Sequence, residues 1–431
     1  MPHRLPRQLP IFAAVKTLYR IGLSLYRTGI RIAAWRSPKA RQWVAGRRGQ
    51  TGRLARWRTA HPGRLLWMHC ASLGEFEQGR PVLEAWRRDH PGWRVLLTFF
   101  SPSGYEVRKT YDGADYVAYL PLDGPVRAAQ FLAAARADMA IFVKYEFWYY
   151  YLTLLKQSET PTLLVAAVFR RHQPFFRWYG GLHREMLTCF TQLFVQDKQS
   201  AEVLAEYQLP LVVAGDTRID RVLTLSRTVA ERPLIEAFVA GAPVLIAGST
   251  WPPDVALLAA WLRDERYANW KLIIAPHEVG YYRHPRSGRD PVANLEGEKL
   301  YYSKLQLPAT GRTLVIDNVG MLNSLYPYAT VVYIGGGFGS GIHNTLEPMA
   351  FAKPVLFGPA HEQFPEAVYL NGYPATGKVV NTADFKRKLD YLIEDAGVYA
   401  QACERSLAYL ETHAGATAQI LSYMRTQAGN G

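Results

Sequence analysis

Residues 331–348 read Val331-Val332-Tyr333-Ile334-Gly335-Gly336-Gly337-Phe338-Gly339-Ser340-Gly341-Ile342-His343-Asn344-Thr345-Leu346-Glu347-Pro348. Four apolar residues, then five glycines in seven positions, then a segment that can form a helix indicate a buried strand, a turn and a helix. The glycines let backbone N–H groups approach an anion closely, and a helix N-terminus adds its positive end. A tight turn that needs positive φ would explain one or two of these glycines but hardly five. The stretch therefore predicts an anion-binding loop at the carboxyl end of a strand.

This loop argues against a dehydrogenase. The fingerprint GxGxxG is not matched cleanly. A nicotinamide site normally follows the first strand of its domain, whereas this loop comes late in the predicted series of strands. The loop therefore favours a different nucleotide-binding enzyme.

Short apolar runs on both sides of the loop predict two sheets of buried parallel strands. One series lies at residues 65–68, 95–98, 140–143, 163–166, 193–195 and 212–215, and the other at 244–247, 272–275, 314–316, 331–334 and 355–357. A polar helix over about residues 221–239 is expected to connect them. We predict an α/β fold, with two doubly wound, Rossmann-like sheets that face each other across a cleft. The predicted parts are a basic amphipathic segment (1–40), a first domain (41–225) and a second domain that includes the C-terminal helices (226–431).

The positive charge of the chain is concentrated at its beginning. The first 74 residues contain fifteen Lys or Arg and no Asp or Glu, whereas the whole chain has 50 basic and 36 acidic residues and a formal net charge of +14. The rest of the chain is therefore nearly neutral. We expect the basic arm to face a polyanionic partner.

The arm has the pattern of an amphipathic helix over residues 11–35. At about 100° per residue, its basic residues Lys16, Arg20, Arg27 and Arg31 fall within about 60° of one another, and aliphatic residues fill the other face. This pattern is typical of a helix that lies in a membrane interface. The helix cannot span a bilayer, because the longest uncharged run in this region, Gln8 to Val15, is eight residues and about 20 are needed. A nucleic-acid arm and a solvated helix without a partner are the alternatives, but neither requires the aliphatic face.

The composition of the remaining chain suits a folded body in a reducing compartment. Apolar residues make up 49% of the chain, which is ample for two cores. The three cysteines, Cys70, Cys189 and Cys403, lie far apart and form no CxxC pair. We therefore expect no disulfide framework and no zinc site.

Candidate nucleotide contacts follow the strands of the second series, where ligands bind in such sheets. Ser249 and Thr250 offer hydroxyl groups, and Met321 ends a segment that could present backbone groups to a base. Glu347 could accept hydrogen bonds from ribose hydroxyls or simply favour a helix start, and the two readings are equally supported. A lone histidine such as His277 is more often structural than a ligand contact. The full set is Ser249, Thr250, His277, Met321, Gly336, Gly337, Asn344 and Glu347.

Glu75 occupies the corresponding place in the first domain. It follows the predicted strand 65–68 and precedes a helical stretch. A carboxylate at such a turn can act as a general base on a hydroxyl group. The usual role of a Glu in the first turn is to stabilise the helix dipole, and the residues alone leave both roles open.

Several ordered motifs extend over most of the chain from about Leu65. They are His69-Cys70-Ala71-Ser72-Leu73-Gly74-Glu75, Leu97-Thr98 with Ser101-Pro102-Ser103-Gly104, Tyr119-Leu120-Pro121-Leu122-Asp123, Glu146-Phe147-Trp148, Ala214-Gly215-Asp216-Thr217-Arg218-Ile219-Asp220-Arg221, Gly248-Ser249-Thr250 and the stretch from His343 to Pro348. Together they resemble the bacterial 3-deoxy-D-manno-octulosonic acid (Kdo) transferases of lipopolysaccharide synthesis, which are GT-B glycosyltransferases. One departure is Tyr149-Tyr150, where the family often has Pro-Asn.

The resemblance implies transfer of Kdo, with inversion, from CMP-Kdo to a lipid A precursor (lipid IVA). It implies that Glu75 is the catalytic base, that Glu146 is a second glutamate at the cleft, and that the first domain binds the acceptor and the second CMP-Kdo. No cofactor and no metal is implied. The implied location is the cytoplasmic face of the inner membrane, at an anionic surface and without nucleic acid. The alternative is another GT-B enzyme, a nucleotide-sugar transferase or an epimerase that uses a UDP-sugar.

Overall fold

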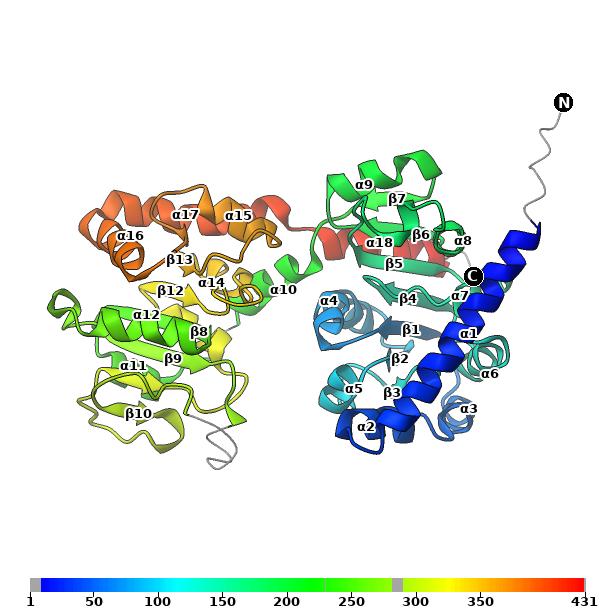
Figure 1. Cartoon of the computed structure of the whole chain (residues 1–431), viewed down its shortest axis with the longest axis horizontal. Helices are drawn as coiled ribbons and strands as arrows, with labels where there is room; N and C mark the ends of the chain where they lie inside the picture. The colour runs from blue at the N-terminus through cyan, green and yellow to red at the C-terminus, as the bar shows by residue number, and fades with distance from the viewer. Residues whose placement is uncertain (1–8, 229, 281–289, 430–431) are drawn as a thin grey trace. The chain divides into compact units, whose positions relative to one another are not determined.

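The computed structural model describes residues 9–228, 230–280 and 290–429, with side chains from residue 15 onward (Figure 1). It divides the chain into two compact units. The first unit contains the chain up to Asp220 together with residues 414–431, and the second contains Arg221–His413. Each unit is built on one parallel sheet of seven strands, so the predicted α/β class with two parallel sheets is confirmed.

The sheet of the first unit has the strand order β3-β2-β1-β4-β5-β6-β7. Its strands are β1 (Leu65–Cys70), β2 (Arg94–Phe99), β3 (Tyr116–Tyr119), β4 (Met139–Val143), β5 (Thr162–Ala167), β6 (Gln192–Val195) and β7 (Leu211–Val213). The helices are α1 (Leu9–Ala33), α2 (Pro38–Gly46), α3 (Gln50–Ala60), α4 (Leu73–Asp89), α5 (Pro102–Arg108), α6 (Pro125–Ala135), α7 (Tyr149–Gln157), α8 (Gly181–Leu187), α9 (Lys198–Leu204), α10 (Thr217–Ser226, which crosses into the second unit) and α18 (Ala416–Gly429).

Helices cover both faces of this sheet, with α4 and α5 on one side and α3, α6 and α7 on the other (Figure 1). The alternation of side chains along β1 accounts for the two cores. Leu65 and Trp67 pack with α3, α6 and α7, whereas Leu66 and Met68 pack against α4 and α18. A strand that is buried on both faces needs apolar residues at every position, which is why the sequence shows uninterrupted apolar runs.

The sheet of the second unit has the strand order β10-β11-β9-β8-β12-β13-β14. Its strands are β8 (Val244–Thr250), β9 (Lys271–Pro276), β10 (Lys299–Tyr301), β11 (Thr313–Val315), β12 (Val331–Ile334), β13 (Val355–Phe357) and β14 (Gly377–Lys378). Its helices are α11 (Pro233–Val239), α12 (Pro252–Leu262), α14 (Leu346–Met349), α15 (Pro365–Asn371), α16 (Thr382–Glu394) and α17 (Ala396–His413).

Each predicted apolar run overlaps an observed strand, but three strands were not predicted. These are β3, β10 and β14, and all three lie at a sheet edge. An edge strand has a neighbour on one side only and is less buried, so it does not require a continuous apolar run. Tyr116, for example, is half-buried. The sequence signal was therefore weakest where the sheets end.

Two predicted boundaries are wrong. The connector expected over residues 221–239 is two helices, α10 and α11, and Pro233 begins the second of them. The C-terminal helices do not all belong to the second domain, because α18 returns to the first unit. Asp220 accepts hydrogen bonds from the backbone N–H groups of Gly415 and Thr417, each at 2.6 Å, and Ile420 packs beside α4.

The predicted amphipathic helix is present as α1, and it is docked on the first unit through its aromatic face. Tyr19 donates a hydrogen bond from its hydroxyl to Asp123 Oδ2 at 2.8 Å. Lys16, one of the four residues of the predicted basic face, forms an ion pair with Glu185 at 3.3 Å. Leu25 and Ile32 are exposed, at 68% and 65%. Among the described residues, none of the helices has both the length and the hydropathy needed to cross a bilayer.

Candidate active site

Glu75 and Glu146 follow two neighbouring strands of the first sheet. Strands β1 and β4 pair in parallel, with His69 opposite Phe142. Glu75 is in the first turn of α4, which follows β1, and Glu146 comes three residues after the end of β4. Because both carboxylates lie beyond carboxyl ends at the same edge of the sheet, they are neighbours and influence each other electrostatically.

The Glu75 carboxylate holds the start of α4, and its pKa is raised. Its Oε2 atom accepts a hydrogen bond from the Ser72 backbone N–H at 2.9 Å, which is the reciprocal bond of a capping box. Burial raises the pKa of Glu75, and the negative charge of Glu146 raises it further, while hydrogen bonds from the Ser72 and Ala71 backbones oppose the shift. A carboxylate with a raised pKa takes up a proton more readily. Stabilising the start of the helix and acting as a general base, the two roles that the sequence left open for Glu75, are therefore compatible.

Glu146 is buried in a hydrogen-bonded group that the sequence did not reveal. His69 Nε2 donates to Glu146 Oε2 at 2.8 Å, and Trp148 Nε1 donates to the same oxygen at 2.8 Å. The other ring nitrogen of His69 lies 2.9 Å from Thr98 Oγ1. The His69 ring is fully buried, so this chain of side chains fixes the position of the Glu146 carboxylate.

Tyr149 and Tyr150, the departure from the family pattern, form the surface on which α1 docks. Tyr149 donates from its hydroxyl to Glu185 at 3.1 Å, and the backbone N–H of Tyr150 donates to Asp123 at 3.0 Å. Both rings lie beside the ring of Tyr19, with centroids 6.3 and 6.4 Å away. The departure thus serves the attachment of α1 in this chain.

Four of the five glycines in the loop of the second unit have a structural reason, and positive φ accounts for only two of them, as expected from the sequence. Gly336 and Gly341 have φ values of +92° and +139°, which favour glycine. A Cβ atom on Gly337 would lie 2.6 Å from the backbone of Gly358, and one on Gly335 would lie 2.5 Å from the Ser249 carbonyl oxygen. Close backbone packing therefore accounts for Gly335 and Gly337.

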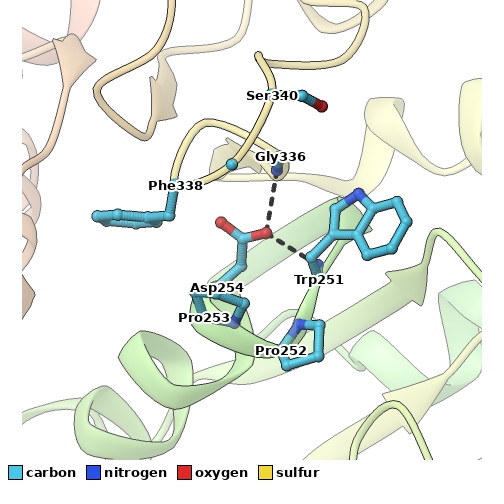
Figure 2. Close-up of a pocket in the computed structure, with 8 residues that line it drawn as sticks. Trp251, Pro252, Pro253, Asp254, Gly336, Phe338 and Ser340 are labelled. Atoms are coloured by element: carbon cyan, nitrogen blue, oxygen red, sulfur yellow. Dashed lines mark hydrogen bonds between the residues drawn. The ribbon is translucent and has the colours of Figure 1, made fainter.

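Asp254 at the start of α12 pins this loop (Figure 2). Its buried carboxylate accepts hydrogen bonds from the backbone N–H groups of Gly336 at 3.0 Å and Trp251 at 2.8 Å, and from the Tyr333 hydroxyl at 2.6 Å. The amides of Gly335 and Gly339 donate to backbone carbonyls of the unit. These three loop amides are therefore already used within the protein, and α14, which follows the loop, has only four residues.

A pocket of about 280 Å³ lies between this loop and the start of α12. Figure 2 shows Trp251, Asp254, Phe338 and Ser340 around it. Beside it, the His277 ring stacks on two other rings, with centroids 4.6 Å from Trp251 and 4.5 Å from His343. Trp251 Nε1 donates to His343 Nε2 at 3.1 Å, and burial lowers the pKa of His343, with a further contribution from His277.

The other predicted nucleotide contacts lie on the same edge of the second sheet but in different surroundings. Asn344 is exposed, and its amide donates to Glu347 Oε1 at 3.0 Å. Met321 is buried, and its sulfur accepts a hydrogen bond from Asn318 at 2.9 Å. Thr250 is buried, whereas Ser249 is half-buried with φ of +54°. In this set, Asn344 and Glu347 are thus two polar side chains that are hydrogen-bonded to each other and still accessible to solvent.

Within residues 9–228, 230–280 and 290–429, the structure contains no group of three His, Cys, Asp or Glu side chains that could hold a metal ion. Cys70 and Cys189 are buried, Cys403 is partly buried, and all three are free thiols.

Comparisons with known proteins place these features in a family context. The family model described as 3-deoxy-D-manno-octulosonic-acid transferase (kdotransferase) matches residues 46–221. The chain is 26% identical to the 3-deoxy-D-manno-octulosonic acid transferase of Bordetella pertussis, over 90% of this chain and 93% of the relative. It is also 26% identical to the enzyme of that name from Aquifex aeolicus, over 76% of this chain and 86% of the relative.

Solved structures resemble the chain in fold. The Anabaena protein HepE in complex with UDP is similar over 84% of this chain and all of its own, with a TM-score of 0.55 and 10% identity. The UDP-GlcNAc 2-epimerase from Methanocaldococcus jannaschii is similar over 76% of this chain and 92% of its own, with a TM-score of 0.50 and 13% identity. The fold is therefore GT-B-like.

Proposed function

Because the chain belongs to the 3-deoxy-D-manno-octulosonic acid (Kdo) transferase family, we propose that it transfers Kdo from CMP-Kdo to a hydroxyl group of a lipid A precursor. The proposal makes it an inverting glycosyltransferase of lipopolysaccharide core synthesis. The observation that supports it most strongly is the Glu75 carboxylate. It lies in the unit that the family model matches, and its pKa is raised by burial beside a second, fixed glutamate.

In this mechanism Glu75 removes the proton from the acceptor hydroxyl group. The hydroxyl oxygen forms a bond to the anomeric carbon of Kdo while the bond from that carbon to the phosphate oxygen of CMP breaks. CMP leaves with the bonding electron pair, and the configuration inverts because the attack comes from the opposite side. The protonated Glu75 then releases its proton to solvent.

Glu146 acts on Glu75 through its charge. It is held by His69 and Trp148, so its negative charge stays at a fixed place near Glu75. That charge keeps the pKa of Glu75 raised and so makes Glu75 a stronger base. The group of His69, Thr98 and Trp148 therefore positions Glu146, and we assign these three as positioning residues.

We place the donor in the second unit, against Asn344 and Glu347. Both side chains are polar and accessible, and they lie just beyond β12, where a parallel sheet binds its ligands. The position of the protein at the cytoplasmic face of the inner membrane is also part of the proposal. The exposed apolar residues of α1 support that position.

Calorimetry with CMP, UMP and UDP tests the donor assignment. We expect CMP to bind more tightly than UMP or UDP, and Glu347→Gln to weaken CMP binding. Glu362→Gln is the matched control, because Glu362 is an exposed carboxylate of the same unit. Tighter binding of UDP than of CMP would overturn the assignment and favour a UDP-sugar enzyme.

A further inference from the structure

A second pocket, of about 620 Å³, lies in the first unit between α1, α2 and the segment that precedes α6. Five of its lining residues are arginines, and we call it the arginine pocket: Arg27, Arg31, Arg47, Arg48 and Arg127. The other lining residues are apolar, and no carboxylate lines it. A pocket with five guanidinium groups and no counter-charge is electrostatically unfavourable when empty.

Two of the arginines build the floor of the pocket. Arg47 donates to the carbonyl oxygens of Leu120 at 2.8 Å and Phe100 at 2.6 Å, and its guanidinium group lies 3.8 Å from the centre of the Trp43 ring. Arg127 donates to the carbonyl oxygen of Leu122 at 2.7 Å. These contacts fix both side chains in place, but carbonyl groups and rings do not neutralise their charge.

The other three arginines are available to a ligand. Among the described residues, the side chains of Arg27, Arg31 and Arg48 form no hydrogen bond and no ion pair. Burial and the neighbouring charges of Arg31 and Arg127 lower the pKa of Arg27, which confirms that the guanidinium groups repel one another. Burial also lowers the pKa of Arg47, to about 9, so Arg47 is still charged at neutral pH.

Asp123, the nearest carboxylate along the chain to this lining, does not serve as the counter-ion. Its Oδ2 atom accepts hydrogen bonds from the Tyr19 hydroxyl at 2.8 Å and the Tyr150 backbone at 3.0 Å. Asp123 is fully buried and does not line the pocket. The positive charges of these arginines are therefore available to an anionic ligand that enters the pocket.

We propose that the arginine pocket binds a phosphate monoester, which, on the basis of the proposed function, is a phosphate group of the lipid acceptor. A phosphate monoester carries about −1.5 to −2 charges at neutral pH and three acceptor oxygens, which matches converging guanidinium forks. Guanidinium groups bind such oxygens in a bidentate manner.

The surroundings of the pocket fit an amphiphilic ligand. Trp35 lines the pocket and is 86% exposed. On α1, Leu18, Leu25 and Ile32 fall within about 40° of one another and are all exposed. These three residues lie about 100 to 180° around the helix from Arg27 and Arg31 and do not line the pocket. The exposed ring of Trp35 is therefore the apolar group beside the arginine pocket that the acyl chains of a phosphorylated lipid can contact.

The test uses the full-length protein and vesicles that differ only in the type of phosphate. Phosphatidic acid carries a phosphate monoester, whereas phosphatidylglycerol carries only a diester. The amounts of the two lipids are chosen so that both types of vesicle have the same surface charge. Inorganic phosphate in solution, measured by calorimetry, shows whether a free anion is sufficient. The variant is Arg31→Gln/Arg48→Gln, since both side chains lack intramolecular partners among the described residues. The control is Arg171→Gln/Arg177→Gln, which removes two exposed arginines of the same unit outside the pocket and outside the basic arm.

We expect wild type and control to prefer phosphatidic acid over phosphatidylglycerol. The Arg31→Gln/Arg48→Gln variant should lose about tenfold more affinity for phosphatidic acid than for phosphatidylglycerol. With a phosphorylated acceptor, the variant should show a raised acceptor KM at nearly unchanged kcat. The proposal is overturned if the variant and the control lose equal affinity for both vesicle types. Because vesicle binding needs no catalysis, this failure is distinguishable from a failure of the proposed function.

Discussion

Replacing Glu75 by Gln should stop Kdo transfer without unfolding the protein. The amide of Gln cannot take the proton of the acceptor hydroxyl, and loss of a general base costs about 10² to 10⁴ in rate. This loss corresponds to about 3–5.5 kcal/mol of transition-state stabilisation. The oxygen of Gln can still accept the hydrogen bond from the Ser72 backbone, because Gln serves as well as Glu at this position of a capping box.

The raised pKa of Glu75 determines the expected sign of the stability change. In the folded state burial disfavours the charged carboxylate, so at neutral pH the charge of Glu75 lowers the free energy of unfolding. Gln removes that cost and keeps the cap, so its melting temperature should not fall. Glu75→Ala removes the cap as well and should lose about 0.5–1.5 kcal/mol. The Gln variant is therefore the cleaner test.

The assay is single-turnover transfer with saturating CMP-Kdo and lipid acceptor, with CMP binding and thermal unfolding measured on the same samples. Glu84→Gln is the matched control, because Glu84 is a carboxylate on the same helix that is paired with Arg80. The control should retain nearly full turnover, since a partly exposed ion pair contributes little. Turnover of the Glu75→Gln variant within a factor of about three of wild type would refute the role of Glu75 as the base.

Three further predictions concern the neighbour of the base, the glycine loop and the arm. Glu146→Gln removes the negative charge that raises the pKa of Glu75, so the pKa should fall and the acid limb of the kcat/KM profile should move to lower pH. Gly337→Ala should destabilise the second unit by about 1–3 kcal/mol, because its Cβ atom would overlap Gly358, whereas Gly339→Ala meets its nearest atom at 3.6 Å and should melt as wild type does. Reversing Arg20, Arg27 and Arg31 to Glu should release the protein from anionic vesicles. Each basic residue near such a surface contributes about 1 kcal/mol of binding free energy, and replacing it by an acidic residue should cost more than that.

Each of these predictions has an outcome that contradicts it. A shift of the acid limb to higher pH in the Glu146→Gln variant would show that Glu146 does not act through its charge. Equal melting temperatures of the Gly337→Ala and Gly339→Ala variants would contradict the packing explanation. For the arm, Lys16→Gln is the control, because Lys16 is paired with Glu185 and its loss should change vesicle binding least. A larger effect of Lys16→Gln than of the reversals would show that α1 binds the membrane differently.

The central strands of both sheets were predictable because burial on both faces leaves a local signal. The runs at residues 331–334 and 355–357 coincide with β12 and β13. Edge strands such as β14 leave little trace, since one side of them is not covered. The return of α18 to the first unit depends on hydrogen bonds between Asp220 and the start of α18, and Asp220 and Gly415 are 195 positions apart. No local pattern could reveal that contact.

The candidate site was predictable in part for the same reason. Glu75 stands at a strand-to-helix turn, which is a local feature, and the family motifs marked Glu146. The hydrogen bond from His69 to Glu146 joins residues 77 positions apart, and the bond from Gly336 to Asp254 joins residues 82 positions apart. Both depend on which strands become neighbours. The packing role of Gly335 and Gly337 could not be predicted, because a sequence does not distinguish glycines needed for backbone packing from glycines needed to approach a ligand.

Mass spectrometry of the lipid acceptor, after incubation with the wild-type protein and a CMP-Kdo generating system, tests the central claim most directly. The account predicts an acceptor that carries Kdo, an equal amount of CMP, and neither product with the Glu75→Gln variant. An unmodified acceptor in the presence of intact CMP-Kdo, or a sugar transferred equally well from a UDP-sugar, would contradict it.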